Sequence, residues 1–229
     1  MPERPYTLLS CSVSLDGYLG DRTPRLALSN DADFDRVDEV RASCDAIMVG
    51  AVTVRTDNPR LLVRSQARRD ERTARGLPAS PMKITVSERV DLDAHSNFFT
   101  AGETEKLVYT SSGRVRYARA RLEPVATIVD GGRRVRMRRL TEDLADRGVG
   151  RLMVEGGGVV HTQFLADDLV DELQLVVAPF FIGDSRAPRF VSDGRFPWNA
   201  GRRATLAAVR QIGDVVLLRY ALSPRFRDE

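Results

Sequence analysis

The chain has 229 residues, 42% of them hydrophobic, which is enough for one α/β domain with a substantial core. Its formal net charge is only +3, because 32 acidic residues offset 35 basic ones, and this balance argues against a nucleic-acid partner. No apolar run reaches the roughly 20 residues that span a bilayer, and no long apolar stretch follows the N-terminus, so we expect a cytoplasmic protein without a membrane partner.

The first eighty residues predict two strands, one helix and two loops. In chain order these are a strand over 6–14, a helix from a cap at Ser29 or Asn30 to about Ala42, a strand over 46–49 ended by Gly50, a polar loop through Thr53, Asp57, Asn58 and Pro59, and a charged surface loop over 66–80. The helix is expected to bury Phe34, Val37 and Val40 along one face.

The rest of the chain predicts seven more strands and two more helices. These are strands over 83–86, 107–109 and 126–128, a helix over 141–147, a strand over 152–154, a helix from the glycines that follow it to about Asp167, and strands over 173–177, 204–211 and 215–220. Gly213-Asp214 predicts a hairpin between the last two strands. We therefore predict a single α/β domain over 1–229, core about 5–221, with a mainly parallel central sheet, helices on both faces and an antiparallel C-terminal hairpin.

The most informative motif is the turn that follows the strand at 152–154. There Glu155 is followed by three contiguous glycines and an apolar helix start. Glycines let a ligand approach the backbone closely, and the N-terminus of the next helix favours a phosphate. The same glycines are also typical of a purely structural turn, and they lack the spacing of a Rossmann fingerprint. The motif alone therefore leaves a phosphorylated ligand and a packing role both open.

Cysteine, histidine and arginine are used in ways that limit the chemistry. Cys11 and Cys44 are expected as small buried residues, and with only two histidines the chain predicts no metal site. Arginines cluster over 114–121 and 133–139 without interleaved aromatic residues. A solvated face is favoured over nucleic-acid binding, although a few of these arginines could contact a cofactor phosphate.

Several segments, taken in order, are similar to those of a known family. They are Ser14-Leu15-Asp16-Gly17, Arg41-Ala42, Asp45-Ala46-Ile47-Met48-Val49-Gly50, Thr53-Val54, Asp57-Asn58-Pro59-Arg60-Leu61, Arg64, Glu155-Gly156-Gly157-Gly158, Phe164-Leu165, Leu169-Val170-Asp171-Glu172-Leu173, Ala178-Pro179 and Ile182-Gly183. This ordered set resembles the pyrimidine reductases of riboflavin biosynthesis, from Pro5 to Tyr220. With no zinc deaminase domain in front, the chain looks like the single-domain archaeal and fungal enzymes rather than the bifunctional deaminase-reductases.

The resemblance implies a fold, a cofactor and a reaction. The fold is dihydrofolate-reductase-like, the cofactor is NADPH and the usual assembly is a homodimer. The reaction reduces the ribosyl group of a 5-phosphoribosylamino-pyrimidine to ribityl by hydride transfer to C1′, so that the cofactor carries the chemistry and the protein supplies placement and charge.

The resemblance also implies site residues, position by position. Cofactor contacts fall on Thr53, Asp57, Ser87, Gly156, Gly157, Gly158, Val159, Val160, His161, Thr162 and Gln163. Substrate contacts fall on Arg41, Leu61, Arg64 and Glu155, and an arginine pair suits a ribose phosphate because each guanidinium can bind two oxygens. Glu155 and Asp57 are the catalytic candidates; the structural alternatives are a helix cap for Glu155 and an Asx turn for Asp57.

Two positions depart from the family pattern. Ser10 stands where bacterial bifunctional relatives carry a lysine, and Arg25 stands where a serine is expected before the first helix. The substrate is therefore left open. The alternatives are a reductase of the same fold that acts on another pyrimidine, pterin or folate-like ring in a specialised pathway, and a non-catalytic NADPH-binding homologue.

Overall fold

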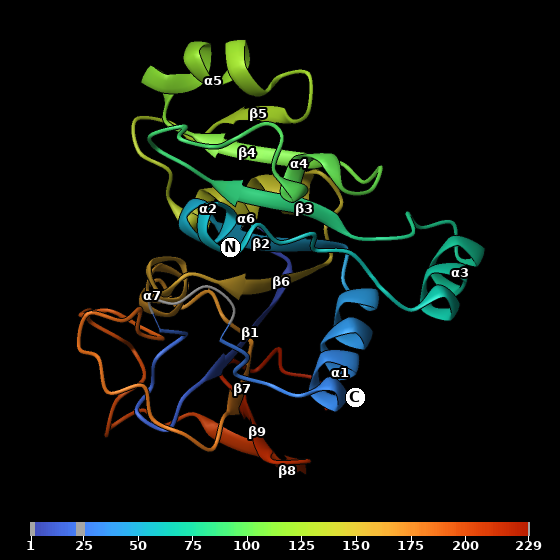
Figure 1. The fold of residues 1–229 in the computed structure, drawn as a ribbon. Helices are drawn as coiled ribbons and strands as arrows, with labels where there is room; N and C mark the ends of the chain where they lie inside the picture. The colour runs from blue at the N-terminus through green and yellow to red at the C-terminus, as the bar shows by residue number, and fades with distance from the viewer. Residues whose placement is uncertain (1–2, 22–25, 229) are drawn as a thin grey trace. The chain divides into compact units, whose positions relative to one another are not determined.

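The computed structural model describes residues 3–21 and 26–228, and the chain forms two compact units (Figure 1). The first unit comprises residues 37–153 together with the N-terminal residues up to Pro5, and the second comprises Tyr6–Arg36 and residues from Val154 onward. The helix α1 (Asp31–Ala42) begins in the second unit and ends in the first. Arg25, one of the two departures from the family pattern, lies outside the described residues.

The first unit is built on parallel strands. They are β2 (Ala46–Gly50), β3 (Met82–Val86), β4 (Lys106–Thr110), β5 (Thr127–Asp130) and the first half of β6 (Arg151–Gly156), in the order β5-β4-β3-β2-β6. β2 pairs with β3, β3 with β4 and β4 with β5 in parallel. Every residue of β2 is buried, as expected for a parallel strand that is covered on both faces.

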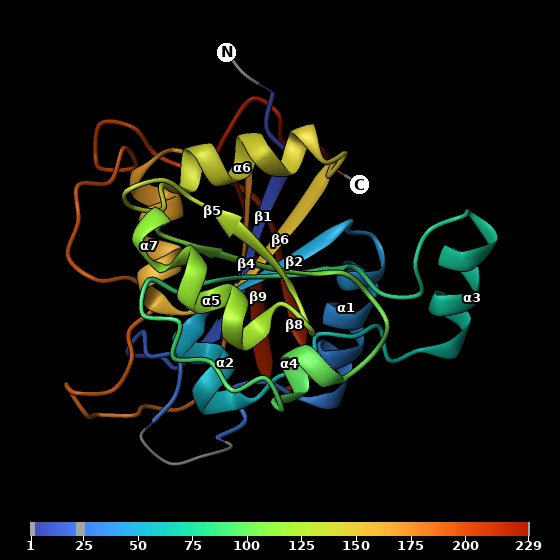
Figure 2. The same cartoon turned by 90° about the horizontal axis from the view of Figure 1, so that it is seen from above.

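Helices cover both faces of this parallel sheet. They are α2 (Ala51–Asp57), α4 (Asn97–Thr100), α5 (Val115–Leu122), which follows the short 3₁₀ turn η1 (Ser112–Arg114), and α6 (Met137–Asp146). From β2 to β5 the chain moves outward across the sheet, and after β5 it returns to β6 beside β2. Right-handed crossovers in opposite directions place their helices on opposite faces. Accordingly, α6 lies on one side of these strands and α2, α4 and α5 lie on the other (Figure 2).

The second unit contains the antiparallel strands at the C-terminal end of the chain. β1 (Tyr6–Val13) pairs in parallel with β7 (Glu172–Val177), which pairs antiparallel with β9 (Val215–Ala221), and β9 pairs antiparallel with β8 (Thr205–Ile212). Gly213 has φ +62° in the two-residue turn between β8 and β9, a backbone conformation that favours glycine at this hairpin position. The helix α7 (Gly158–Ala166) follows the three glycines. Mainly parallel strands, helices on both faces and the C-terminal hairpin confirm the predicted fold class.

Two predicted loops are helices. The segment that contains Thr53 and Asp57 forms α2, because Val54 is buried and anchors the turn, and the helix ends where Asn58 takes a left-handed φ of 45°. Within the predicted loop 66–80, residues Gln66–Ala74 form α3, capped by the Ser65 side chain, which accepts from the backbone N–H of Arg68. The polar composition of both segments predicted loops. The features that stabilise the helices are the single buried residue Val54 in α2 and the Ser65 cap in α3.

Other predictions need correction in their details. α1 buries Asp33 and Arg36 rather than Phe34, which is 38% exposed, and Val37 and Val40 are only half-buried. The Arg36 Nε donates to Asp33 Oδ1 over 2.6 Å, so the charges on this buried face are paired. Helices α4 and α5 were not predicted, α6 begins four residues early at Met137, and Cys11 is half-buried while Cys44 is buried.

Candidate functional site

In the first unit, predicted cofactor residues gather at the carboxyl ends of two neighbouring strands. Gly50 and Val86 are partners in the register of β2 and β3, so α2 and Ser87 start side by side at this edge. Thr53 lies half-buried in the first turn of α2, and Asp57 is exposed at its last residue, where it accepts from the Thr56 hydroxyl over 2.8 Å. Ligands of open parallel sheets bind at such carboxyl ends.

The loop after β3 is held in a strained conformation. Val90 is buried with φ 57°, which is a genuine outlier for a β-branched residue. The Ser87 hydroxyl accepts from the Val90 N–H over 3.0 Å and donates to Asp91 over 3.3 Å, while Arg55 of α2 pairs with Asp91 at 2.8 Å. Strain that the surroundings over-determine is characteristic of ligand-binding segments. In this structure Ser87 serves to shape the loop.

The predicted substrate residues Arg41, Leu61 and Arg64 come together at the end of α1. Arg41 Nη1 donates to the backbone oxygen of Leu62 over 3.4 Å, and the neighbouring Leu61 is 2% exposed with φ 50°. The Arg64 side chain is exposed, so its guanidinium can reach a ligand in solution.

Asp38 of α1, which sequence reasoning missed, holds this loop. Its carboxylate accepts from the backbone N–H groups of Arg64 and Ser65, and Arg68 Nη1 donates to it over 3.0 Å. Burial would raise the pKa of Asp38, but these N–H donors and the Arg68 charge outweigh burial and hold that pKa below its ordinary value of 3.8. The local sequence carries no signal for this role, because the backbone groups that Asp38 holds lie 26 and 27 residues away.

We expect Asp38→Asn to lower the free energy of unfolding by about 1.5 kcal/mol at neutral pH, because the amide can accept only one of the two backbone N–H bonds. The Michaelis constant for the substrate should rise with it, since Leu61 and Arg64 lose their support. A carboxyl with a lowered folded pKa stabilises the protein above the unfolded pKa and loses that effect as pH falls through the folded value. The difference from the parent should therefore shrink in acid.

Urea unfolding at several pH values measures this effect, with Glu39→Gln on the exposed side of α1 as the matched control. A parallel pH dependence of Asp38→Asn and the parent would contradict the role assigned to this carboxylate.

In the second unit, the glycine run is shaped by the chain's own backbone. Gly157 has φ 91° and ψ 119°, which only glycine adopts readily. A Cβ at Gly158 would lie 2.3 Å from the carbonyl oxygen of Arg189, so the segment at 189 already occupies that space. The Thr162 hydroxyl accepts from the Ser192 N–H over 2.8 Å. Packing at Gly158 therefore requires the absence of a side chain, and the positive φ of Gly157 permits the turn.

His161 of α7 is fully buried against the same segment. Its Nδ1 lies 3.3 Å from the backbone oxygen of Phe190, and its Nε2 is buried without a hydrogen-bond partner among the described residues. Burial lowers the pKa of His161 to about 4, against which the Phe190 hydrogen bond works only partly, so the imidazole is neutral at physiological pH. Val159, in contrast, is 63% exposed in the first turn of α7.

Two further exposed apolar side chains lie just beyond the carboxyl ends of β1 and β7. These are Leu15 and Phe181, and the Leu15 N–H donates to the Phe180 oxygen over 2.8 Å. Asp16 joins the two loops by accepting from the Gly183 N–H over 2.8 Å, and the Ser14 hydroxyl together with such backbone donors lowers the pKa of Asp16 to about 2.

The remaining predicted residues of the second unit lie on β6 and α7. Glu155 and Gly156 are the last two residues of β6, with Glu155 half-buried and Gly156 buried, and Gln163 is half-buried on α7. Val160 is buried. In the described part of the chain, no three His, Cys, Asp or Glu residues are grouped to hold a metal ion, and no helix is long and apolar enough to cross a membrane.

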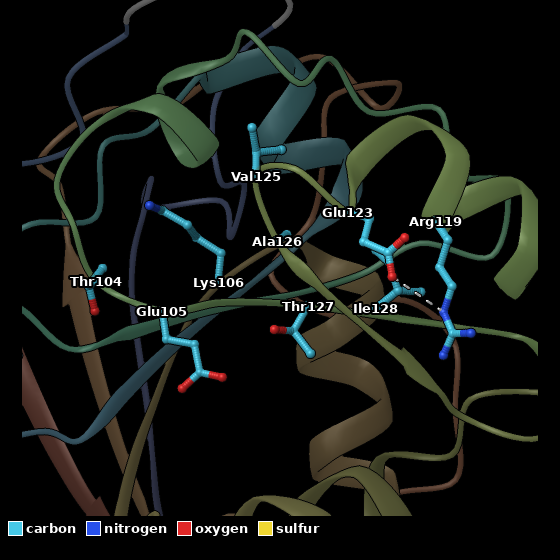
Figure 3. A pocket seen from close by; sticks show the side chains of 9 residues that line it. All are labelled: Thr104, Glu105, Lys106, Arg119, Glu123, Val125, Ala126, Thr127 and Ile128. Atoms are coloured by element: carbon cyan, nitrogen blue, oxygen red, sulfur yellow. Dashed lines mark ion pairs between the residues drawn. The ribbon is translucent and has the colours of Figure 1, made fainter.

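The first unit also holds two cavities, and of the residues considered as ligand contacts in the sequence analysis only arginines of the two clusters line them. One, of about 420 Å³, lies at the amino ends of β4 and β5, where Arg119 and Glu123 of the α5 region are 4.0 Å apart (Figure 3). Because ligands of parallel sheets bind at the opposite edge, this cavity is not the candidate site. The other, of about 400 Å³, lies at the carboxyl ends of the same strands.

Comparisons with known proteins agree with this arrangement. The family described as the RibD C-terminal domain matches residues 5–218. A protein of Archaeoglobus fulgidus named 2,5-diamino-6-ribosylamino-4(3H)-pyrimidinone 5′-phosphate reductase is 33% identical over 97% of this chain and 99% of its own length. A protein of Methanothermobacter thermautotrophicus with the same name is 34% identical over 83% of this chain and 85% of its own. The solved structure of a pyrimidine reductase-like protein from Corynebacterium diphtheriae superposes with a TM-score of 0.81 at 21% identity, covering 95% of this chain and 91% of that one.

Proposed function

The chain belongs to the RibD C-terminal domain family, and on this premise we propose that it is the reductase of a phosphoribosylamino-pyrimidine in riboflavin biosynthesis, with NADPH as the reductant. The observation that carries the proposal is the near-complete match to a reductase of that name, which covers 97% of this chain and 99% of the relative. The preferred substrate is the 2,5-diamino-6-ribosylamino-pyrimidinone 5′-phosphate, whose ribosyl group becomes ribityl.

In each unit, the predicted cofactor residues lie at the carboxyl ends of that unit's own strands, where each set suits a part of a dinucleotide. When bound, the nicotinamide supplies the hydride that reduces C1′. Gly157 has no side chain to cap α7, so the first turn of that helix remains available to a phosphate. The exposed Val159 offers an apolar contact to a ring, and Thr53 and Asp57 present polar groups at the two ends of α2. We propose that these residues bind and orient the cofactor.

We further propose that the substrate phosphate is bound by Arg41 and Arg64. Asp38 fixes the backbone at Arg64, and the exposed side chain of Arg64 can be approached by a phosphate from solvent. Glu155, half-buried at the end of β6, would accept hydrogen bonds from the amino groups of the pyrimidine ring. Asp57 is the second candidate for a group that touches the reacting atoms.

The test is oxidation of NADPH, followed by absorbance at about 340 nm, on addition of the diamino substrate to the purified protein. We expect turnover, and we expect Arg64→Ala to raise the Michaelis constant for this substrate by about tenfold, because one charge-assisted hydrogen bond is lost. The affinity for NADP⁺ should not change. Arg60→Ala, an exposed arginine in the same loop, is the matched control. Absence of oxidation with both the diamino and the deaminated substrate would refute the proposal.

We propose a homodimer on the basis of an apolar sheet face in the second unit. The register aligns aliphatic residues of β7, β9 and β8 on one face, namely Leu173, Leu175, Val177, Val216, Leu218, Leu206 and Val209. Leu206 and Val209 are 51% and 59% exposed, and the β7 members are half-buried. A face of this composition favours contact with the same face of a second copy, because such a contact is self-complementary. Sedimentation equilibrium measures this state.

A further inference from the structure

The second cavity of the first unit combines an apolar floor with a charged rim. It lies where β4 and β5 end and α6 begins, with a volume of about 400 Å³. Its floor is formed by Tyr109, Val129, Val135 and Leu140, and its rim by Ser112, Asp130, Gly131, Gly132, Arg136, Arg139 and Asp143. This composition suits a flat ring that carries an anionic group.

The two arginines at the rim are the groups available to bind an anion. Among the described residues, the Arg136 and Arg139 side chains form no hydrogen bond or ion pair. The Asp143 carboxylate is already engaged, because it accepts from the Tyr109 hydroxyl over 2.6 Å and from Arg147 Nε over 2.7 Å. The Asp130 carboxylate would repel an anion. However, its Oδ1 accepts hydrogen bonds from the Ser112 hydroxyl and the Gly132 N–H, and these two bonds hold the carboxylate in the turn.

The cavity lies one strand away from a predicted cofactor residue. The Ser87 N–H donates to the Tyr109 oxygen over 3.0 Å, and the Thr110 hydroxyl donates to the Ser87 oxygen over 2.8 Å. Ser87 and this cavity therefore share the carboxyl edge of the sheet, and a ligand at Ser87 can extend over β4 toward the arginines.

We propose that this cavity binds the ribose 2′-phosphate of the cofactor, and that Arg136 and Arg139 set the preference for NADPH over NADH. The inference rests on the proposed function for the identity of the ligand. A guanidinium fork binds phosphate oxygens in pairs, and the phosphate dianion offsets the charge of both arginines. An acidic residue after a strand binds a free ribose 2′-hydroxyl instead, and Asp130 would take that role in an enzyme specific for NADH.

The test uses fragments that undergo no chemistry. Calorimetric titration of the full chain with 2′,5′-ADP and with 5′-ADP compares two ligands that differ only in the 2′-phosphate. We expect the parent to bind 2′,5′-ADP more tightly, and the double variant Arg136→Ala/Arg139→Ala to lose about 30-fold or more for 2′,5′-ADP while 5′-ADP changes by less than about twofold. Arg138→Ala, between the two arginines in sequence but outside the cavity lining, is the matched control and should behave as the parent.

Each other outcome overturns the inference. If the parent favours 2′,5′-ADP and the double variant keeps that preference, the 2′-phosphate lies elsewhere while the proposed cofactor stands. If the double variant loses the same affinity for 2′,5′-ADP and for 5′-ADP, the arginines attract anions in general and do not recognise the 2′-phosphate. If the parent binds neither fragment, this inference and the proposed cofactor fail together. Circular dichroism of the variants excludes misfolding, which we do not expect because both arginines are exposed.

Discussion

Gly158→Ala is expected to lower the free energy of unfolding by about 3 kcal/mol and to weaken NADP⁺ binding at least about tenfold. The added Cβ would lie 2.3 Å from the Arg189 carbonyl oxygen, which belongs to the backbone and cannot rotate away. Either α7 or the segment at 189 must move. Any movement of α7 shifts the first helical turn, which the proposed function gives to the cofactor phosphate.

The matched control is Gly113→Ala in the 3₁₀ turn η1, where an added Cβ meets nothing within 4 Å. This control should retain the stability and the cofactor affinity of the parent. Urea unfolding and a fluorescence titration with NADP⁺ on the same samples separate the two effects. Parent-like stability of Gly158→Ala would show that the glycine is not required for packing.

The free energy of unfolding should fall by about 3 kcal/mol between neutral pH and pH 4 through His161 alone. Its pKa is lowered from 6.5 to about 4 in the folded protein, because burial disfavours the imidazolium. Between these values the unfolded chain binds the additional proton. The stabilisation is therefore complete above the unfolded pKa and is lost as pH falls.

The measurement is urea unfolding across this range for the parent and for His161→Phe, which cannot titrate and can keep the ring contact with Phe190. The variant should lack the His161 part of the pH dependence, even if its stability at neutral pH differs. His95→Gln, at an exposed position, is the matched control and should follow the parent. Identical pH profiles for His161→Phe and the parent would be incompatible with a buried neutral imidazole.

The sequence by itself determined the strands, the hairpin and the family. Buried parallel strands such as β2 are continuous apolar runs, and the turn at Gly213 needs a residue that tolerates positive φ, so local pattern suffices for both. The ordered motifs, from the Asp57 segment to the Glu155 segment, likewise identified the reductase family that the comparisons show. The roles predicted for individual site residues stay predictions.

Only the tertiary structure decided what the polar residues do. α1 buries Arg36 because, besides its local pair with Asp33, it donates to the Gln174 side chain 138 residues away. α2 forms because Val54 is buried. The contact with Gln174 and the burial of Val54 are not encoded in the local sequence. Asp38 supports Arg64 from 26 residues away. The glycine run fitted a ligand or a packing turn equally well. The packing constraint at Gly158 comes from the Arg189 carbonyl, a contact between distant segments that periodicity and spacing do not encode.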